Sequence, residues 1–168
     1  RVQQGVAYPA LMESDEGFVY KPVGFFQHEY GDETAFLFEP DGSLLAIARD
    51  GAAKNALVCR SQPPFTEWSR VKLARQIGGP MLAKWAGGYL IGGRKSEPEK
   101  PSRTALWWLV DDTLEEIAEL PSGGDTSYPG FVALGDSDGL LSFYSSHEGS
   151  GTGDPPSAIY LADLRIVA

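Results

Sequence analysis

The chain has 168 residues, of which 42% are hydrophobic, and this size and composition suit one globular domain with a buried core. Its 14 basic and 23 acidic residues give a formal net charge of −9, which disfavours binding to nucleic acid or to an anionic membrane surface. Twenty glycines and twelve prolines leave little room for helices of ordinary length, so the composition favours an all-β fold of short strands.

The predicted elements begin with a hairpin in residues 7–20. Their sequence, AYPALMESDEGFVY, places one apolar run on each side of a polar turn that ends in glycine. Residues 127–147, SYPGFVALGDSDGLLSFYSSH, repeat this order of Tyr-Pro, apolar run, turn and apolar run. Because only about 25 residues separate Tyr8 from the next repeat, we interpret the first hairpin as a truncated copy of a longer unit.

Three full units follow, and each opens with a hairpin. The turns PDGS, AGGY and SDGL, at residues 40–43, 86–89 and 137–140, lie about 46 and about 51 residues apart, a spacing typical of β-propeller blades. Further strand-like runs follow each hairpin, and four strands make one blade. We therefore predict one partial β-propeller domain of four-stranded antiparallel blades, with approximate boundaries at 1–32 (partial), 33–78, 79–127 and 128–168.

Two segments also carry helix signals. Thr113, with Glu116 three residues later, forms a capping box at the start of TLEEIAEL. Residues 65–79, FTEWSRVKLARQIGG, have the pattern of an amphipathic helix. The register of the repeat favours strands at both places.

Polar residues recur where the first strand of each unit begins and where the second ends. The first strands begin at Glu33, Gly79 and Tyr128, and the second strands end at Arg49, Arg94 and Tyr144. In equivalent blades these positions share one rim near the central axis, where ligands bind. Two arginines can hold a carboxylate through paired N–H donors. A tyrosine beside a carboxylate can be activated as a nucleophile.

Other reactive side chains give weaker signals. Asp125, close to Tyr128, is a candidate proton donor, or alternatively an aspartate that only forms a turn. The single cysteine, Cys59, lies in an apolar strand and is predicted to be a buried, unreactive thiol. His28 and His147 have no second ligand at metal-binding spacing, so we expect neither a metal site nor a cofactor.

Together these residues resemble the exo-α-sialidases and related propellers with bacterial-neuraminidase repeats. The resemblance covers nearly the whole chain and is clearest in ETAFLFEPDGSLLAIARD, GGPMLAKWAGGYLIGGRK and GGDTSYPGFVALGDSDGLLSFYSSHEG. In that family a glutamate, two arginines and a tyrosine follow one another in this order. The resemblance implies that Tyr128 is a nucleophile assisted by Glu33, and that Arg49 and Arg94 bind the carboxylate of sialic acid. Tyr144 is then a further substrate contact.

The chain also departs from this family. The first arginine and the acid/base aspartate of the family belong to early blades that this sequence does not contain. The Asp-box motif, Ser-x-Asp-x-Gly-x-Thr-Trp, survives only as SQPPFTEW, in which Ser61 and Trp68 match. We therefore expect half of a six-bladed propeller. Either missing N-terminal blades or a second copy in a homodimer would close it, because open blades expose unpaired strand edges.

Three functions remain open at this point. The first is binding, with hydrolysis, of an acidic or sialic-acid-like glycan. The second is a non-catalytic propeller module that binds glycan or protein, and the third is an assembly scaffold. No apolar run approaches the roughly 18 residues that span a membrane. A start at Arg1 fits either a piece of a longer protein or removal of a signal peptide, and the latter favours a secreted or periplasmic location.

Overall fold

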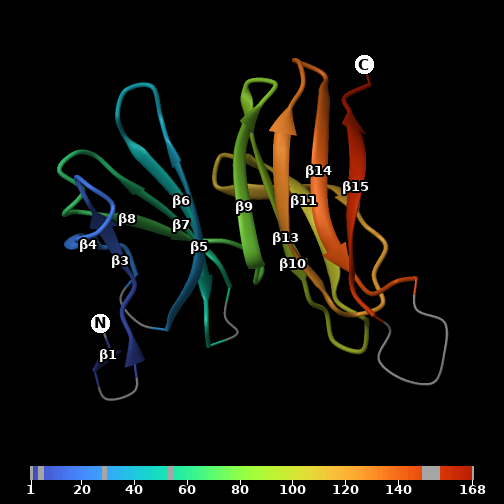
Figure 1. Ribbon diagram of the computed structural model, residues 1–168, viewed down its shortest axis with the longest axis horizontal. Coiled ribbons are helices and arrows are strands. Elements are labelled where there is room, and N and C mark those ends of the chain that lie inside the picture. Colours follow the sequence, from blue (N-terminus) through green and yellow to red (C-terminus); the bar gives the residue numbers. More distant parts are fainter. Residues whose placement is uncertain (1, 4–5, 28–29, 53–54, 149–155, 168) are drawn as a thin grey trace.

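The computed structural model describes residues 2–3, 6–27, 30–52, 55–148 and 156–167, so His28 lies outside the described residues. Within these ranges every regular element is a strand, and the strands pair in antiparallel sheets. Figure 1 shows the larger sheets side by side in chain order, with the N-terminal hairpins at one end of the row and the C-terminal strand at the other. The all-β prediction is confirmed.

The first large sheet has four strands in sequential order. They are β5 (Gly31–Phe38), β6 (Leu44–Asp50), β7 (Leu57–Ser61) and β8 (Ser69–Lys72). The turn between β5 and β6 contains Gly42 at φ +84°, a backbone conformation that glycine adopts without steric cost. Residues 44–48 of β6 are all buried, because neighbours cover both faces of this strand.

The second large sheet has the same sequential order. Its strands are β9 (Gly78–Trp85), β10 (Gly88–Lys95), β11 (Arg103–Val110) and β12 (Thr113–Glu119). The segment that begins with the capping box at Thr113 is therefore a strand, as the repeat predicted. Residues 65–79 likewise form no helix, since they contain β8 and the first residues of β9.

The remaining sheets are smaller. The third large sheet contains β13 (Thr126–Ala133), β14 (Asp138–Ser145) and β15 (Ala158–Arg165). Near the N-terminus, β1 (Val2–Gln3) pairs with β2 (Val6–Ala7), and β3 (Ala10–Glu13) pairs with β4 (Lys21–Phe25). The sequence predicted the second strand of the first hairpin at the GFVY run, residues 17–20. In the structure this run lies in the connection between β3 and β4, and its Phe18 is 88% exposed.

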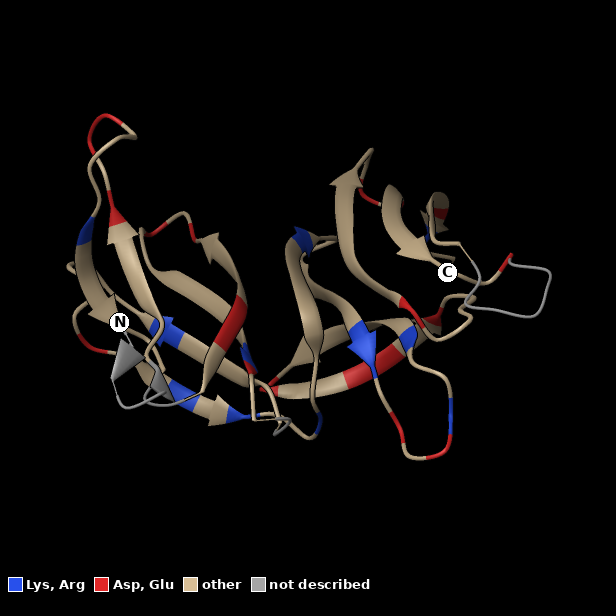
Figure 2. Cartoon of the chain, turned by 60° about the horizontal axis from the view of Figure 1, so that its bottom comes forward, with Lys and Arg blue, Asp and Glu red and all other residues tan. Residues whose placement is uncertain are grey.

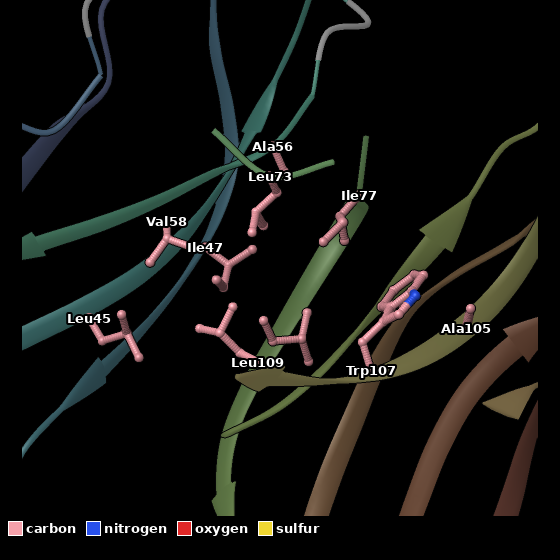
Figure 3. Packing of buried hydrophobic residues seen from close by; sticks show 10 residues of the cluster. Leu45, Ile47, Ala56, Val58, Leu73, Ile77, Ala105, Trp107 and Leu109 are labelled. Carbon is pink, nitrogen blue, oxygen red and sulfur yellow. The ribbon is translucent and has the colours of Figure 1, made fainter. Parts of the chain in front are cut away.

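Apolar clusters join neighbouring sheets. The cluster between the first and second large sheets, most of whose members are labelled in Figure 3, consists of Leu45, Ile47, Ala56, Val58, Leu73, Ile77, Ile91, Ala105, Trp107 and Leu109. A second cluster, around Leu90, Leu106 and Phe143, joins the second sheet to the third. These contacts hold the three large sheets together. The candidate site lies at the end of the sheets where their first strands begin.

Cys59 lies in β7 and is fully buried. Burial raises the pKa of its thiol to about 11. Because the thiolate is the reactive form of cysteine, this thiol is unreactive in the folded protein. The predicted buried thiol is confirmed.

Candidate active site

The three large sheets share an irregularity at the same end. In each, two residues of the first strand lie opposite a single residue of the second strand, which is a β-bulge. The bulge pairs are Asp32–Glu33 in β5, Gly79–Pro80 in β9 and Tyr128–Pro129 in β13. Bulges redirect side chains and occur often beside active sites. Here they place polar groups from three sheets on one rim.

The bulges correct one detail of the sequence prediction. The repeat offsets aligned Glu33 with Gly79 and Tyr128. The pairing registers instead align Asp32 with Gly79 and Tyr128, so that Glu33 corresponds to Pro80 and Pro129. Despite this shift of one residue, the predicted side chains do converge on one rim.

The carboxylate of Glu33 is where the three sheets meet. Its Oε2 atom accepts a hydrogen bond from Arg49 Nη1 at 2.5 Å and another from the backbone N–H of Gly79 at 2.9 Å. Its Oε1 atom accepts a hydrogen bond from the hydroxyl of Tyr128. Oε2 is thus held in place by Arg49 and Gly79, and Oε1 faces the tyrosine.

These bonds set the protonation states of Glu33 and Tyr128. Burial alone would raise the pKa of Glu33, but hydrogen bonds from Tyr128, Arg49 and the Gly79 amide outweigh it and hold the pKa below its ordinary value. The hydrogen bond to the Glu33 carboxylate raises the pKa of Tyr128. The resting pair is therefore a neutral phenol that donates to an ionised carboxylate, the arrangement that a nucleophile and its base require.

Tyr128 has an unusual backbone. Its φ is +49°, in the left-handed region, whereas the equivalent residue of the second sheet is a glycine, Gly79, with φ +52°. Such a conformation costs a residue with a Cβ atom roughly 1–2 kcal/mol. The side chain is nonetheless 58% exposed, so burial of its ring does not explain why this position holds a tyrosine. Strain of this kind is often found at functional sites.

A second polar group, formed by Arg94, Tyr144 and Asp125, lies beside the first. Arg94 donates from Nε to the carbonyl of Thr126 at 2.7 Å and from Nη2 to the hydroxyl of Tyr144 at 2.8 Å. That hydroxyl donates to Asp125 Oδ1 at 2.8 Å. The rings of Tyr128 and Tyr144 stack with centroids 6.2 Å apart, so the two groups form one continuous surface.

The two tyrosines differ in what their oxygen atoms can do. The Tyr144 oxygen both accepts from Arg94 and donates to Asp125. Burial, together with the bond to Asp125, raises the pKa of Tyr144. The Tyr128 oxygen, within the described ranges, only donates to Glu33. Of the two tyrosine oxygens, that of Tyr128 therefore has the less engaged lone pairs, which makes Tyr128 the better candidate for a nucleophile.

Asp125 is placed as an acceptor. Its Oδ1 accepts from Tyr144, and its Oδ2 accepts from Ser157 at 3.1 Å. An ionised carboxylate satisfies both bonds. This geometry favours a role in orienting Tyr144 over the role of proton donor that the sequence suggested.

Among the described residues, the charges around the site are balanced to within one unit. Asp32, Glu33 and Asp125 supply three carboxylates, and Arg49 and Arg94 supply two guanidinium groups. Arg49 Nε lies 3.4 Å from Asp32 and makes no hydrogen bond to any residue that the structure describes. Figure 2 shows acidic and basic segments interspersed over this side of the molecule. The rim therefore offers individual donors and acceptors, not one large field of a single sign.

A groove lies at the other, hairpin end of the first sheet, away from this site. Its volume is about 670 Å³, and its walls include Ser43, Arg60, Trp68 and Tyr89. The two Asp-box matches lie beside it and stabilise the turn between β7 and β8. Ser61 donates to the Glu67 carbonyl at 2.6 Å, and Trp68 Nε1 donates to the Phe65 carbonyl at 2.9 Å. At the candidate site, by contrast, Tyr128 is mostly exposed.

Sequence reasoning missed some members of the site. Asp32 was not singled out, although it lies next to Glu33 and within 3.4 Å of Arg49. The backbone N–H of Gly79 and the hydroxyl of Ser157 were also missed. The Gly-Gly-Pro sequence at residues 78–80 was the one local signal of a special backbone position.

Comparisons with known proteins bear on the fold. No protein-family model and no curated protein matches the chain. A crystal structure of a protein of unknown function from Dyadobacter fermentans DSM 18053 is similar, with a TM-score of 0.74 and 19% identity over 95% of this chain and 46% of that one. An α-L-arabinanase from Penicillium chrysogenum, solved with arabinobiose, gives a TM-score of 0.59 and 15% identity over 81% of this chain and 46% of that one. This chain thus spans less than half of either structure, and at these identities the likeness shows an all-β fold that the three proteins share.

Proposed function

We propose that this chain forms part of a β-propeller glycoside hydrolase in which Tyr128 is the nucleophile and Glu33 its base. The observation that carries the proposal is the hydrogen bond from the exposed, strained Tyr128 to a carboxylate that Arg49 and Gly79 hold in place. The arabinanase among the similar structures supports a glycan-processing role. The sequential four-stranded sheets support the propeller.

The proposed reaction has two steps. In the first, the Tyr128 oxygen attacks the anomeric carbon, its proton passes to Glu33 Oε1, and the bond to the leaving group breaks. An aryl leaving group departs as its phenolate and needs no proton from the enzyme. In the second step the hydroxyl of a water molecule joins the anomeric carbon and the bond between that carbon and the Tyr128 oxygen breaks. The remaining proton of the water passes to solvent, and the Tyr128 oxygen takes back its proton from Glu33.

The proposed substrate is an acidic, sialic-acid-like glycan. A tyrosine nucleophile suits such a substrate because a neutral phenol does not repel a sugar carboxylate as a carboxylate nucleophile would. Arg49 and Arg94 retain exposed surface and are the groups that would bind that carboxylate. Tyr144 holds Arg94 in position and offers its ring edge to the sugar.

A fluorogenic aryl sialoside tests this function, with an aryl arabinoside as the alternative substrate. We expect the sialoside to be hydrolysed and Tyr128→Phe to lower kcat by about a thousand-fold or more, because the attacking oxygen is lost. Tyr144→Phe is the matched control: it keeps the nucleophile and should mainly raise KM. Hydrolysis at an unchanged rate in Tyr128→Phe would exclude Tyr128 as the nucleophile.

A second candidate is a non-catalytic glycan-binding module. It is favoured by the 58% exposure of Tyr128, because a reacting atom in contact with solvent is not shielded from water. In this case the unaltered chain would bind a sialylated oligosaccharide without turnover, and Tyr128→Phe would keep most of the affinity. Arg94→Ala would weaken binding under either candidate.

A further inference from the structure

Gly79 touches both members of the proposed catalytic pair. Its N–H donates to Glu33 Oε2 at 2.9 Å. A Cβ atom at this position would lie 2.9 and 3.1 Å from Cδ1 and Cε1 of the Tyr128 ring, and 2.4 Å from Ser127 Oγ. The tyrosine ring therefore lies against the place where any other residue would have a side chain.

The two bulges interlock through this contact. Gly79 and Tyr128 are equivalent residues of neighbouring sheets, and both have left-handed backbones. The Gly79 bulge turns an amide toward Glu33 on one side of the second sheet and leaves a gap for the Tyr128 ring on the other. Ser127 Oγ donates to the carbonyl of Gly78 at 2.9 Å and ties the two strands together.

We propose that Gly79 is a positioning residue, which sets the distance between the Tyr128 hydroxyl and Glu33 Oε1 by leaving room for the ring and by holding the carboxylate through its amide. This inference rests on the proposed function for its catalytic meaning. The positioning itself is a property of the resting protein and can be measured without a substrate.

Gly79→Ala tests the proposal through the titration of Tyr128. With tyrosine labelled at Cζ with ¹³C, the Tyr128 resonance is identified by its loss in Tyr128→Phe. In the unaltered chain we expect this resonance to titrate above the ordinary tyrosine pKa of 10.0, because the phenol donates to Glu33. Gly79→Ala should move the titration back toward the ordinary value, as Glu33→Gln should.

Gly87→Ala is the matched control. Gly87 lies in the turn between β9 and β10 with φ +77°, so an alanine there introduces the same kind of backbone strain. A Cβ atom at Gly87 would contact nothing within 4 Å. We expect this variant to leave the Tyr128 titration unchanged. An equal shift in Gly87→Ala, or no shift in Gly79→Ala, would overturn the proposal.

A second pair of variants provides the test in case the Gly79→Ala protein folds poorly. Ser127→Gly removes the closest contact of the added methyl group and leaves the ring contact. Comparing Ser127→Gly with Ser127→Gly/Gly79→Ala therefore isolates the effect on Tyr128. If both Gly79→Ala proteins unfold while the Gly87→Ala and Ser127→Gly proteins fold, Gly79 is required for folding and the positioning role is wrong.

Kinetics separates this inference from the proposed function. If the chain hydrolyses the sialoside, Gly79→Ala should lower kcat by about 10- to 100-fold with little change in KM, because misplacement of the attacking atom affects the transition state most. If Gly79→Ala shifts the Tyr128 titration but the unaltered chain has no hydrolase activity, the positioning role holds and the proposed enzymatic function is wrong. If the unaltered chain is active but Gly79→Ala leaves the Tyr128 titration unchanged, the hydrolase function holds and the positioning role is wrong.

Discussion

Tyr128 combines a left-handed backbone with a side chain that is mostly exposed to solvent. Tyr128→Ala and Tyr128→Gly both remove the ring and its hydrogen bond, and they differ only in the Cβ atom. We expect Tyr128→Gly to be the more stable by about 0.5–1 kcal/mol in urea unfolding, after allowance for the extra entropy that glycine loses on folding. The native residue would then be a case in which placement of a hydroxyl outweighs backbone strain.

Val132, on the same strand, provides the control for this comparison. It is exposed and does not have a positive φ. At this position Val132→Ala should be more stable than Val132→Gly, as is usual in a strand. If Tyr128 shows the same order as Val132, the left-handed strain at Tyr128 has no energetic consequence.

Glu33 gives a prediction about pH. Its pKa is below the ordinary 4.5 in the folded protein, so its ionised form stabilises the fold fully above that value. This contribution should decline as the pH falls below about 4.5 toward the lower folded pKa. Urea unfolding at a series of pH values from 7 to 3 should therefore show a smaller acid loss of stability in Glu33→Gln than in the unaltered chain. Glu115→Gln, an exposed change outside the site, should keep the full loss; identical profiles for all three proteins would contradict the prediction.

At the scale of single elements, the sequence predicted the strands better than their registers. β12 shows the reason. Leu106 pairs with Ala118 and Trp107 with Glu116, so Ile117 is an extra residue in a bulge. This bulge interrupts the alternation of inward and outward side chains, which left the capping box at Thr113 as the strongest local signal. Only the repeat, a non-local pattern, predicted a strand.

The same limit applied to the candidate site. The repeat spacing brought Glu33, Arg49, Arg94 and Tyr128 to one rim, but a bulge adds a residue without leaving a mark in the sequence. The alignment of Glu33 with Tyr128 was therefore wrong by one position. The amide of Gly79 could not be predicted either, because a backbone donor depends on the local turn and not on residue type.

Trp107 should contribute more than any other single residue to the stability of the packing between the first and second large sheets. It is fully buried in the cluster between the first and second sheets, and its Nε1 donates to Glu116 at 3.1 Å. We expect Trp107→Ala to lower the unfolding free energy by about 3–5 kcal/mol. Its neighbour Trp108 lies on the other face and is only partly buried, so Trp108→Ala should cost less. Equal losses in urea unfolding would show that the first cluster does not dominate stability.

At the scale of the whole molecule, the two ends of the row of sheets differ from its middle. The first and second large sheets have four strands, whereas the third has three in the described part of the chain and ends in β15. Ile159 and Leu161 on β15 are 81% and 66% exposed. The two similar structures described above are each more than twice as long as the region that matches this chain. An exposed apolar edge strand is a site at which another chain can add.

We propose that a second copy of this chain covers that edge, which is the homodimer that the sequence also suggested. Light scattering on a sizing column should then give twice the mass of one chain, and the double change Ile159→Lys with Leu161→Lys should give one chain mass. Because both side chains are mostly exposed in the single chain, the same change should alter its unfolding free energy by less than about 0.5 kcal/mol. Phe18→Lys, a change at an exposed residue of the N-terminal hairpins, tests which surface of the second copy meets β15. If β15 of one copy packs against the N-terminal hairpins of the other, this change should weaken the dimer as well. If the unaltered chain is a monomer at all concentrations, the dimer is rejected. Any activity measured in the assay would then have to come from the candidate site of a single chain.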